Sequence, residues 1–430
     1  MSAESGAPQR SQGVWFPALP APVDLDDLLE PFSRRGVDLG LDRLRAALAE
    51  GGNPQERFAA VQVAGTNGKG SICTFLHSIL RQAGLRVGTY RSPHLVSWCE
   101  RIQLGDAWIT PEQLRDDLGR WQAIGRRHAL TPFELLTAAA FDRFARSELD
   151  LVILEVGLGG RLDATTAHPR RPVIGLASIG LDHREHLGET LAAIAAEKAG
   201  VMTEAADVFS GPQDPEVAAV LEAEARRCGS RLHWLEPLAE VSAGGPILGL
   251  NGGWQRRNAA VAVAMAQALA QRGWVIPGPA IEAGLAMARW PGRLERRRWQ
   301  GGELLLDGAH NPPAAQALAG ELRAMGGSGG GRRWLLGMQR HKQAPEMLTA
   351  LLGPADRARI VPILDHRCWD VASLAEAVPG LAAHLEPGSE GENGLERDLA
   401  WLTATDGAVP VVAGSLHLLG QVIPLLDPEL

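Results

Sequence analysis

A single lysine stands in a glycine-rich turn near the start of the chain, in residues 65–71 (Gly-Thr-Asn-Gly-Lys-Gly-Ser). Glycines allow backbone N–H groups to converge on phosphate oxygens, and a lysine at the start of a helix adds positive charge. The common phosphate-loop pattern has Ser or Thr directly after the lysine. Here Gly70 separates Lys69 from Ser71. The turn therefore predicts a triphosphate site of a less common kind.

Further polar clusters follow four other predicted strands. Ligands gather at the carboxyl ends of the strands in a parallel sheet, so we expect these clusters to lie beside the glycine turn. Their shared position carries more weight than any one motif. The clusters are residues 91–94 (Arg-Ser-Pro-His), Glu155 with residues 157–163, residues 182–183 (Asp-His), and residues 307–312 (Asp-Gly-Ala-His-Asn-Pro).

Glu155 and His183 are candidate metal ligands because of where they stand. Glu155 ends an apolar strand, where an ionised carboxylate requires a metal or a cationic partner. An ion pair with Arg161 is the structural alternative. His183, beside Asp182, suits a ligand as well as an ordinary loop histidine. Hard oxygen ligands beside a nucleotide favour Mg²⁺ over zinc.

Three other segments have a structural interpretation beside a functional one. Lys198 ends a predicted helix, where a cation is favourable for its charge alone. The arginines at 293 and 296–298 suit a polar, solvated linker, and Arg293 also suits a phosphate clamp, because a nucleotide would be bound at the domain join. Residues 131–134 (Thr-Pro-Phe-Glu) are typical of a helix start, with Thr131 as the cap.

Composition limits the class of protein. A chain of 430 residues exceeds the usual size of a single core, so two domains are expected. The net charge of −8 argues against a general nucleic-acid binder. Four widely spaced cysteines favour reduced thiols. The first 20 residues lack the apolar core of a signal peptide, and no charge-free apolar stretch is long enough for a bilayer. We expect a cytoplasmic protein without membrane or nucleic-acid partners.

The clusters require strands that alternate with helices. Apolar strands separated by helices predict a parallel sheet covered on both faces. In the first two-thirds of the chain we predict strands at 60–64, 85–90, 150–156, 173–178 and 208–210, and helices at 72–80, 111–128, 133–147, 191–199, 215–228, 257–272 and 281–289.

A second alternation follows the break at residues 290–295. It predicts strands at 303–306, 334–337, 359–364 and 409–413, and helices at 312–325, 395–403 and 416–426, with a glycine-rich surface loop at 326–331. We therefore predict an α/β fold of two domains. Residues 1–295 form a P-loop-type parallel-sheet ATPase domain with a flexible segment at 1–20, and residues 296–430 form a smaller Rossmann-like α/β domain.

Ordered motifs along the chain closely resemble the folylpolyglutamate synthase/dihydrofolate synthase family, which is related to the Mur ligases. Gly70, which departs from the common loop pattern, matches this family. Thr166 departs from it, because the family often has Asn there. The motifs are residues 64–71, 92–95 with 100–102, 154–165, 181–183, 197–200, 291–293, 307–312 and 413–417. They span the chain from about residue 38 to the final predicted helix.

The resemblance implies ATP-dependent amide formation. A substrate carboxylate attacks the γ-phosphate of ATP, giving an acyl phosphate and ADP, and the amine of L-glutamate then displaces phosphate. The implied acceptors are dihydropteroate, reduced folates or both, with Mg²⁺ as the metal and a monomer as the expected state. Positioning and charge neutralisation can supply most of the catalysis, because phosphate is a good leaving group.

The resemblance also implies roles for individual residues. Lys69, His183 and Lys198 are expected to be catalytic, and Ser92, Glu155 and His183 to bind Mg²⁺. Lys198 is expected to be carbamylated, which turns a cation into an anion. The residues expected to bind ATP are Gly65, Thr66, Asn67, Gly68, Lys69, Gly70, Ser71, Asn258, Arg293, Asp307 and His310. Those expected to contact the pterin substrate are Thr131, Pro132, Phe133, Glu134, Leu162, Asp163 and Ala164.

Two competing interpretations fit the sequence less well. A Mur-type ligase usually carries a separate N-terminal domain for its uridine nucleotide, and the residues before Gly65 are too few to form one. A non-catalytic ATP-binding module predicts the loss of Glu155, His183 or Asp307, and all three are present.

Overall fold

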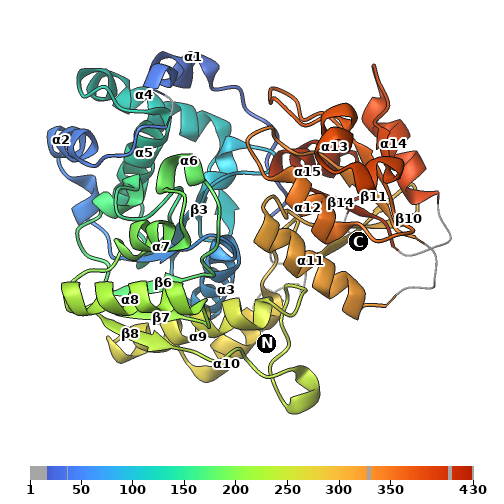
Figure 1. Cartoon of the computed structure of the whole chain (residues 1–430). Helices are drawn as coiled ribbons and strands as arrows, with labels where there is room; N and C mark the ends of the chain where they lie inside the picture. Colours follow the sequence, from blue (N-terminus) through green and yellow to red (C-terminus); the bar gives the residue numbers. More distant parts are fainter. Residues whose placement is uncertain (1–16, 36, 327–330, 405–408, 429–430) are drawn as a thin grey trace, which may run out of the picture.

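The computed structural model describes residues 17–35, 37–326, 331–404 and 409–428 of the chain. These residues form two α/β domains, each built around its own sheet (Figure 1). The first domain is coloured blue to yellow in Figure 1 and the second orange to red. Both sheets are mostly parallel, which confirms the predicted fold class.

The first sheet has eight strands in the order β4-β3-β2-β5-β1-β6-β7-β8. The strands from β2 to β8 in this order run parallel, while β3 and β4 add an antiparallel edge. Their bounds are Ala60–Ala64 (β1), Val87–Tyr90 (β2), Ile102–Leu104 (β3), Ala107–Trp108 (β4), Leu151–Glu155 (β5), Val173–Leu176 (β6), Asp207–Ser210 (β7) and Arg231–Trp234 (β8).

Helices cover both faces of this sheet because its buried strands are apolar on both sides. Successive residues of β5 show the alternation, with Ile153 in the core beneath α3 and α9, and Val152 in the core beneath α4 and α5. The helices are α1 (Asp26–Leu29), α2 (Asp42–Glu50), α3 (Lys69–Gln82), α4 (Pro111–Arg127), α5 (Pro132–Arg146), α6 (Arg184–Leu187), α7 (Leu191–Ala199), α8 (Pro215–Cys228), α9 (Gln255–Gln271) and α10 (Gly278–Met287).

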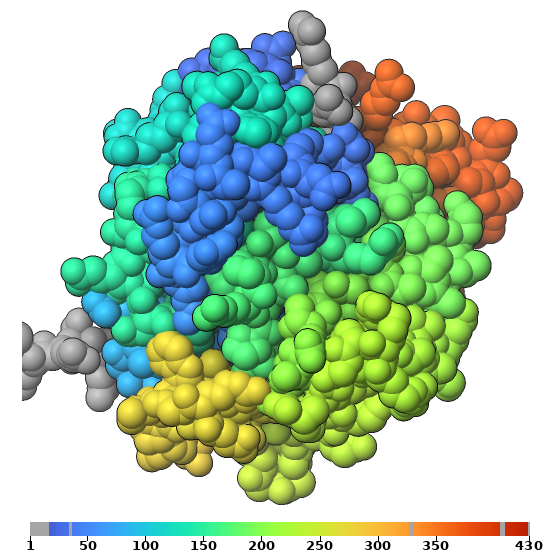
Figure 2. Space-filling view, turned by 90° about the vertical axis from the view of Figure 1, so that its left-hand side faces the viewer, coloured from blue at the N-terminus to red at the C-terminus, as the bar shows by residue number. Residues whose placement is uncertain are grey.

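The N-terminal helices complete the cover of the first domain. Helices α1 and α2 pack on α4, and α2 also contacts α5. In the space-filling view the blue N-terminal segments lie beside the teal α4 on the side of the molecule facing the viewer (Figure 2). Short 3₁₀ turns at Glu30–Arg35, Pro54–Glu56, Trp98–Arg101, Ala164–Ala167 and Val241–Ala243 connect the main elements.

The second sheet has the order β13-β12-β11-β14-β10-β9 and is parallel except for β9. Its strands are Glu295–Trp299 (β9), Gly302–Leu306 (β10), Arg333–Leu336 (β11), Arg357–Ile360 (β12), Leu385–Pro387 (β13) and Val411–Ala413 (β14). Its helices are Pro312–Ala324 (α11), Ala344–Leu351 (α12), Val371–Ala377 (α13), Gly394–Thr403 (α14) and Leu416–Val422 (α15), with 3₁₀ turns at Pro379–His384 and Ile423–Leu425.

The interpretation of residues 296–298 as a linker is wrong. These arginines lie in β9, the antiparallel edge strand of the second sheet, where Arg296 and Arg298 pair with Glu303 of β10. Charged side chains are common on an exposed sheet edge, and for that reason the run of arginines did not resemble a strand in the sequence. The second sheet thus begins at Glu295, and the division of the chain at residues 295/296 stays a prediction.

Two element bounds also differ from the sequence pattern. The strand predicted at 359–364 is β12, which ends at Ile360, and the apolar pattern continues only because Val361 and Ile363 are buried in the loop that follows. The helix predicted at 416–426 ends at Val422, and a 3₁₀ turn containing Pro424 replaces its last turn.

Some expectations fall outside the described residues. These are the flexible segment at 1–20, for its first 16 residues, and most of the glycine-rich loop at 326–331. Within the described part of the chain, no helix has the length and apolar character needed to cross a membrane.

One loop of the first domain is buried in the second. Leu95 lies in the apolar cluster formed by β10, α14 and α15, together with Leu418 and Leu419. The carboxylate of Glu100 holds this loop by accepting hydrogen bonds from the N–H groups of residues 95–97, at 3.0, 2.6 and 2.6 Å. Because the same loop begins at Ser92, the contact fixes one part of the predicted site against both domains.

A substitution at Gly420 of α15 tests this contact. A Cβ atom there would lie 1.9 Å from the carbonyl oxygen of Leu95. We expect Gly420→Ala to destabilise the protein by about 1–3 kcal/mol and to lower its thermal midpoint, although alanine favours a helix. Gly320→Ala is the matched control, since a Cβ atom in that part of α11 meets nothing within 4 Å. Equal midpoints for the two variants would contradict the contact.

Candidate active site

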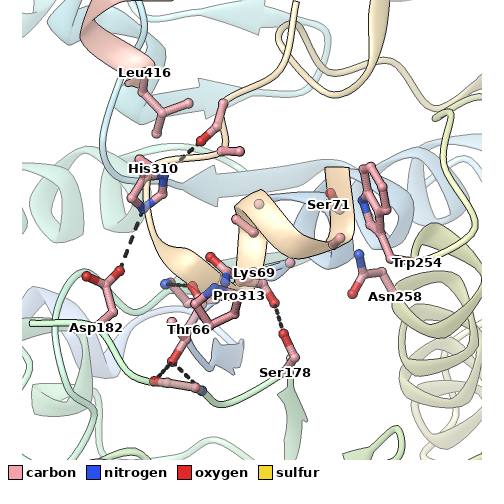
Figure 3. Close-up of a pocket in the computed structure, with 18 of the residues that line it drawn as sticks. Thr66, Lys69, Ser71, Ser178, Asp182, Trp254, Asn258, His310, Pro313 and Leu416 are labelled. Carbon is pink, nitrogen blue, oxygen red and sulfur yellow. Dashed lines mark hydrogen bonds and ion pairs between the residues drawn. The ribbon is translucent and has the colours of Figure 1, made fainter. Parts of the chain in front are cut away.

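The glycine-rich turn joins β1 to α3 and curls around its own lysine. Gly65 and Gly68 have φ values of +135° and +103°, and a Cβ atom at Gly65 would meet the backbone of Ala177. Lys69 Nζ donates to the carbonyl oxygens of Gly65 and Thr66, at 3.1 and 3.2 Å. Figure 3 shows Lys69 and Thr66 in this turn. The helix start and the left-handed glycines give the geometry of an anion-binding loop.

A cavity of about 350 Å³ lies over this turn and is lined by both domains. Apart from Gly65, the first residue of the turn, it brings together every residue predicted to bind ATP or metal. These lining residues are Thr66, Asn67, Gly68, Lys69, Gly70, Ser71, Ser92, Glu155, His183, Asn258, Arg293, Asp307 and His310; Lys198 also lines the cavity.

Glu155 is a buried carboxylate at the carboxyl end of β5. Burial raises its pKa, against the opposing charges of Lys69, Arg91 and Arg293. The ion pair with Arg161 is wrong, because Arg161 binds Glu197 at 2.5 Å.

The atoms around Glu155 have the donor chemistry that Mg²⁺ prefers. The backbone N–H of Ser92 lowers the pKa of Glu155, while the Ser92 hydroxyl oxygen is buried without a hydrogen-bond partner. Carboxylate and hydroxyl oxygens beside a phosphate site suit this ion. Among the described residues, no group of three or more His, Cys, Asp and Glu side chains is placed to hold a metal ion.

His183 adopts a left-handed backbone conformation, with φ of +51°, directly before α6. Burial lowers its pKa to about 3, so the imidazole is neutral and keeps a lone pair for a metal. Its Nε2 atom lies 3.9 Å from Asp182 Oδ2. The same oxygen atom lies 3.7 Å from His310 Nε2 of the second domain.

Asp182 connects the two domains, which the sequence did not reveal. Its carboxylate accepts hydrogen bonds from Lys342 Nζ at 2.6 Å and Asn311 Nδ2 at 2.8 Å, both in the second domain. Burial opposes its ionisation, but Lys342 and the two histidines hold its pKa below the usual range. Asn311 also bonds to Asn67 at 2.9 Å, so these residues, the Asp182 cluster, tie the second domain to the phosphate loop.

Arg293 precedes the first strand of the second sheet, and Asp307 follows its second strand. Asp307 accepts hydrogen bonds from the N–H groups of Leu294 and Ala309, each at 2.9 Å. It therefore shapes the chain that carries Arg293 into the cavity, and its predicted contact with ATP stays a prediction.

A second cavity, of about 860 Å³, meets the first at Ser92, His183 and His310. All the residues predicted to contact the pterin line it, namely Thr131, Pro132, Phe133, Glu134, Leu162, Asp163 and Ala164. Several of these polar side chains form hydrogen bonds with the backbone instead of pointing into the open cavity. Glu134 and Thr131 form the capping box of α5, and Asp163 accepts hydrogen bonds from residues 157 and 158.

The rest of the second cavity carries cations and histidines that the sequence analysis left without a role. Arg101 donates to His94 and lies over Trp98, and among the described residues it has no carboxylate partner. The two motifs that contain Arg101 and Ser415 were visible in the sequence as part of the resemblance. The polar lining residues that also had no predicted role include Asp38, Glu185, His186, Gln339, His341, Lys342 and His417.

Thr166, the departure from the family pattern, is buried beneath the loop after β5. Its hydroxyl donates to the carbonyl oxygen of Gly160 at 2.7 Å and accepts from Gln62 at 3.0 Å. The residue therefore stabilises the loop that carries residues 157–163.

The chain contains three lysines, Lys69, Lys198 and Lys342, and each lines one of these two cavities. Lys198 is buried and donates to the carbonyl oxygen of Gly65 at 3.0 Å. Its ammonium group therefore faces the phosphate loop, although it stands in the last turn of α7. Burial, together with the charge of Lys69, lowers its pKa to about 7, a value that arginine could not reach.

Comparisons with known proteins agree with this geometry. Residues 293–425 match the family described as "Dihydrofolate synthetase, C-terminal domain". The chain is 32% identical to the dihydrofolate synthetase of Saccharomyces cerevisiae, over 92% of this chain and 99% of that protein. The structure of Mycobacterium tuberculosis folylpolyglutamate synthase complexed with ADP and AMPPCP is 28% identical and superposes with a TM-score of 0.84, over 94% of this chain and 98% of the other.

A further structural neighbour contains a metal. The bifunctional folylpolyglutamate synthase/dihydrofolate synthase of Yersinia pestis, complexed with AMPPNP and a Mn ion, is 29% identical with a TM-score of 0.80, over 95% of this chain and 99% of the other. The fold and the site together define an ATP-dependent ligase of two α/β domains. The chain belongs to the folylpolyglutamate synthase/dihydrofolate synthase family, which confirms the resemblance found in the sequence.

The pKa of Lys198 predicts a pH-dependent stability. A folded pKa of about 7, below the ordinary value of 10.5, means that the unfolded chain binds this proton more tightly. The free-energy cost of burying the charged Lys198 therefore has its full value below pH 7. It falls as the pH rises from about 7 to 10.5. Lys198→Met removes it, so we expect the stability advantage of this variant over the natural chain to shrink between pH 6 and pH 9. Unfolding in bicarbonate-free buffer measures this, and a constant difference would contradict the lowered pKa.

Proposed function

We propose that this protein catalyses the ATP-dependent ligation of L-glutamate to dihydropteroate, with reduced folates as a second acceptor, through an acyl phosphate. The observation that carries the proposal is the meeting of the two cavities at Ser92, His183 and His310. One cavity contains the phosphate loop, and the other offers an apolar pocket for a flat ring system. A carboxylate at the end of that substrate reaches the γ-phosphate at their junction.

The chemistry follows from this arrangement. A carboxylate oxygen of the acceptor forms a bond to the γ-phosphorus, and the bond to the leaving ADP oxygen breaks. The glutamate nitrogen then bonds to the acyl carbon, loses a proton, and phosphate departs. Lys69, Arg293 and the amides of residues 66–71 are positioned to neutralise the charge that moves between these oxygens.

Ser92, Glu155 and His183 fit a Mg²⁺ ion. Their oxygen and nitrogen atoms border the phosphate loop, and the Ser92 hydroxyl has no other partner. When bound, the ion would supply positive charge that offsets the negative charge of the phosphates. The neutral state of His183 and the buried position of Glu155 prepare both groups for this role.

The cations of the larger cavity suit the incoming amino acid. L-Glutamate carries two carboxylates, and the unpaired Arg101 is a bidentate donor for one of them. The nearby Ser415 adds a hydroxyl from the second domain. A cytoplasmic location and a monomeric state belong to the same proposal.

Release of ADP from ATP tests the function. We expect the purified protein to release ADP only when both dihydropteroate and L-glutamate are present, with a second activity on tetrahydrofolate. Glu155→Gln should lower turnover by about 10²-fold or more, because it removes a buried charge at the phosphates. Glu148→Gln is the control, since that side chain is 91% exposed. An absence of ADP release with every pterin acceptor would overturn the proposal.

Carbamylation of Lys198 is a separate proposal about the same site. A buried amine with a pKa of about 7 is largely neutral at physiological pH and can add carbon dioxide. The resulting anion would face Lys69 and provide an oxygen ligand for a second Mg²⁺ ion.

The small number of lysines makes the carbamate measurable. We expect ¹³C-bicarbonate to give one carbamate resonance that Lys198→Arg removes, and we expect Lys198→Ala to be nearly inactive and partly restored by acetate. The Lys342→Arg variant serves as the spectroscopic control. Full activity of Lys198→Ala without an added carboxylate would refute the modification.

A further inference from the structure

Arg257 lines the smaller cavity without a partner of its own. It stands in α9, directly before Asn258, which approaches Gly68 of the phosphate loop. Its Nε atom is buried without a hydrogen bond, and the described residues provide no carboxylate for its guanidinium group. The neighbouring Arg256 differs, because it binds the carbonyl oxygen of Pro246 and the carboxylate of Glu240.

A partly buried cation without an acceptor is unfavourable in the protein alone. Burial is the only cause that acts on the pKa of Arg257, and it lowers that pKa. Guanidinium groups remain charged and carry five N–H donors, so a molecule bound in the cavity can supply the acceptor that Nε lacks.

The backbone fixes where the guanidinium group lies. A Cβ atom at Gly211 would be 2.4 Å from Arg257 Cγ, so this glycine leaves room for the stem of the arginine above the end of β7. In the sheet, β7 is two strands away from β1, which leads into the phosphate loop. Two strand spacings are about 10 Å. Arg257 is therefore displaced from the loop toward the nucleoside end of a nucleotide whose terminal phosphates the loop holds.

Nearby residues give this end of the cavity a shape suited to a nucleoside. Trp254, one helical turn before Arg257 and Asn258, lines the same cavity and lies beside Asn258 (Figure 3). Ala314 and Ala317 of α11 also line it, from the second domain. An indole and two small side chains leave room for a flat base, while the arginine supplies donors for oxygen atoms.

We propose that Arg257 binds the ribose hydroxyl groups of ATP and sets the nucleoside specificity of this protein. The inference rests on the proposed use of ATP in this cavity. The ribose hydroxyl oxygens are acceptors close to the base. The backbone amides of the phosphate loop do not donate hydrogen bonds to them.

Calorimetric titration with ADP tests the assignment without relying on catalysis. We expect Arg257→Gln to weaken ADP binding about ten-fold and Arg257→Lys to weaken it less, the loss expected for hydrogen bonds to a charged donor. The Arg257→Gln substitution should change the affinity for 2′,3′-dideoxy-ADP by less than two-fold or so, because this analogue lacks the ribose hydroxyl acceptors. Inorganic pyrophosphate should bind both proteins equally. Arg323→Gln, an exposed position on α11, is the control.

The outcomes separate the possible errors. Unchanged ADP affinity in Arg257→Gln, with an unchanged melting midpoint, would overturn the inference. An equal loss for ADP and pyrophosphate would overturn it as well, by placing the arginine on the phosphates. An equal loss for ADP and dideoxy-ADP would place it on the base. If the natural protein does not bind ADP, the proposed ATP site itself fails, and this inference fails with it.

Discussion

The site depends on one buried interaction between the domains, the contact of Asp182 with Lys342 and Asn311. Asp182 follows β6 of the first sheet, and both partners belong to the second domain. Removal of one member of such a buried pair typically costs about 3–5 kcal/mol, because the other charge stays buried and unpaired. Since Asn311 also bonds to Asn67, the same contact fixes the phosphate loop, His183 and His310 relative to one another. The contact thus holds residues that line both cavities in place relative to one another.

Several charged and polar groups of the site lack partners in the protein, and the substrates would supply those partners. Glu155, Arg257 and Arg101 are buried wholly or in part without direct partners of opposite charge, and the Ser92 hydroxyl lacks a hydrogen bond. Phosphates, a divalent metal and substrate carboxylates supply the missing groups in the proposed function. Such preorganised, uncompensated groups reduce stability in the free protein and act most strongly where water is excluded. Lys198 follows the same logic, since burial lowers its pKa to about 7.

Much of this was predictable from the sequence because motifs at the ends of parallel strands must converge. The phosphate loop, the strand ending at Glu155 and the helix ending at Lys198 follow from apolar periodicity and glycine placement. Contacts between the domains were not predictable in the same way. Lys342 lies in a polar segment without a pattern, and only the fold brings it to Asp182. The strand β9 was missed because its arginines face the sheet edge, and Arg257 was missed because Gly211, 46 positions earlier in the chain, directs its side chain.

The central claim is that the acceptor carboxylate is phosphorylated at the junction of the two cavities before glutamate is joined. An isotope experiment tests this most directly. Dihydropteroate labelled with ¹⁸O in both carboxyl oxygens is ligated to L-glutamate, and the released phosphate is examined by mass spectrometry. The account predicts one ¹⁸O atom in each phosphate for every amide bond formed. Amide formation with unlabelled phosphate would contradict it, because the oxygen would then have left the carboxyl group by a route that bypasses the acyl phosphate.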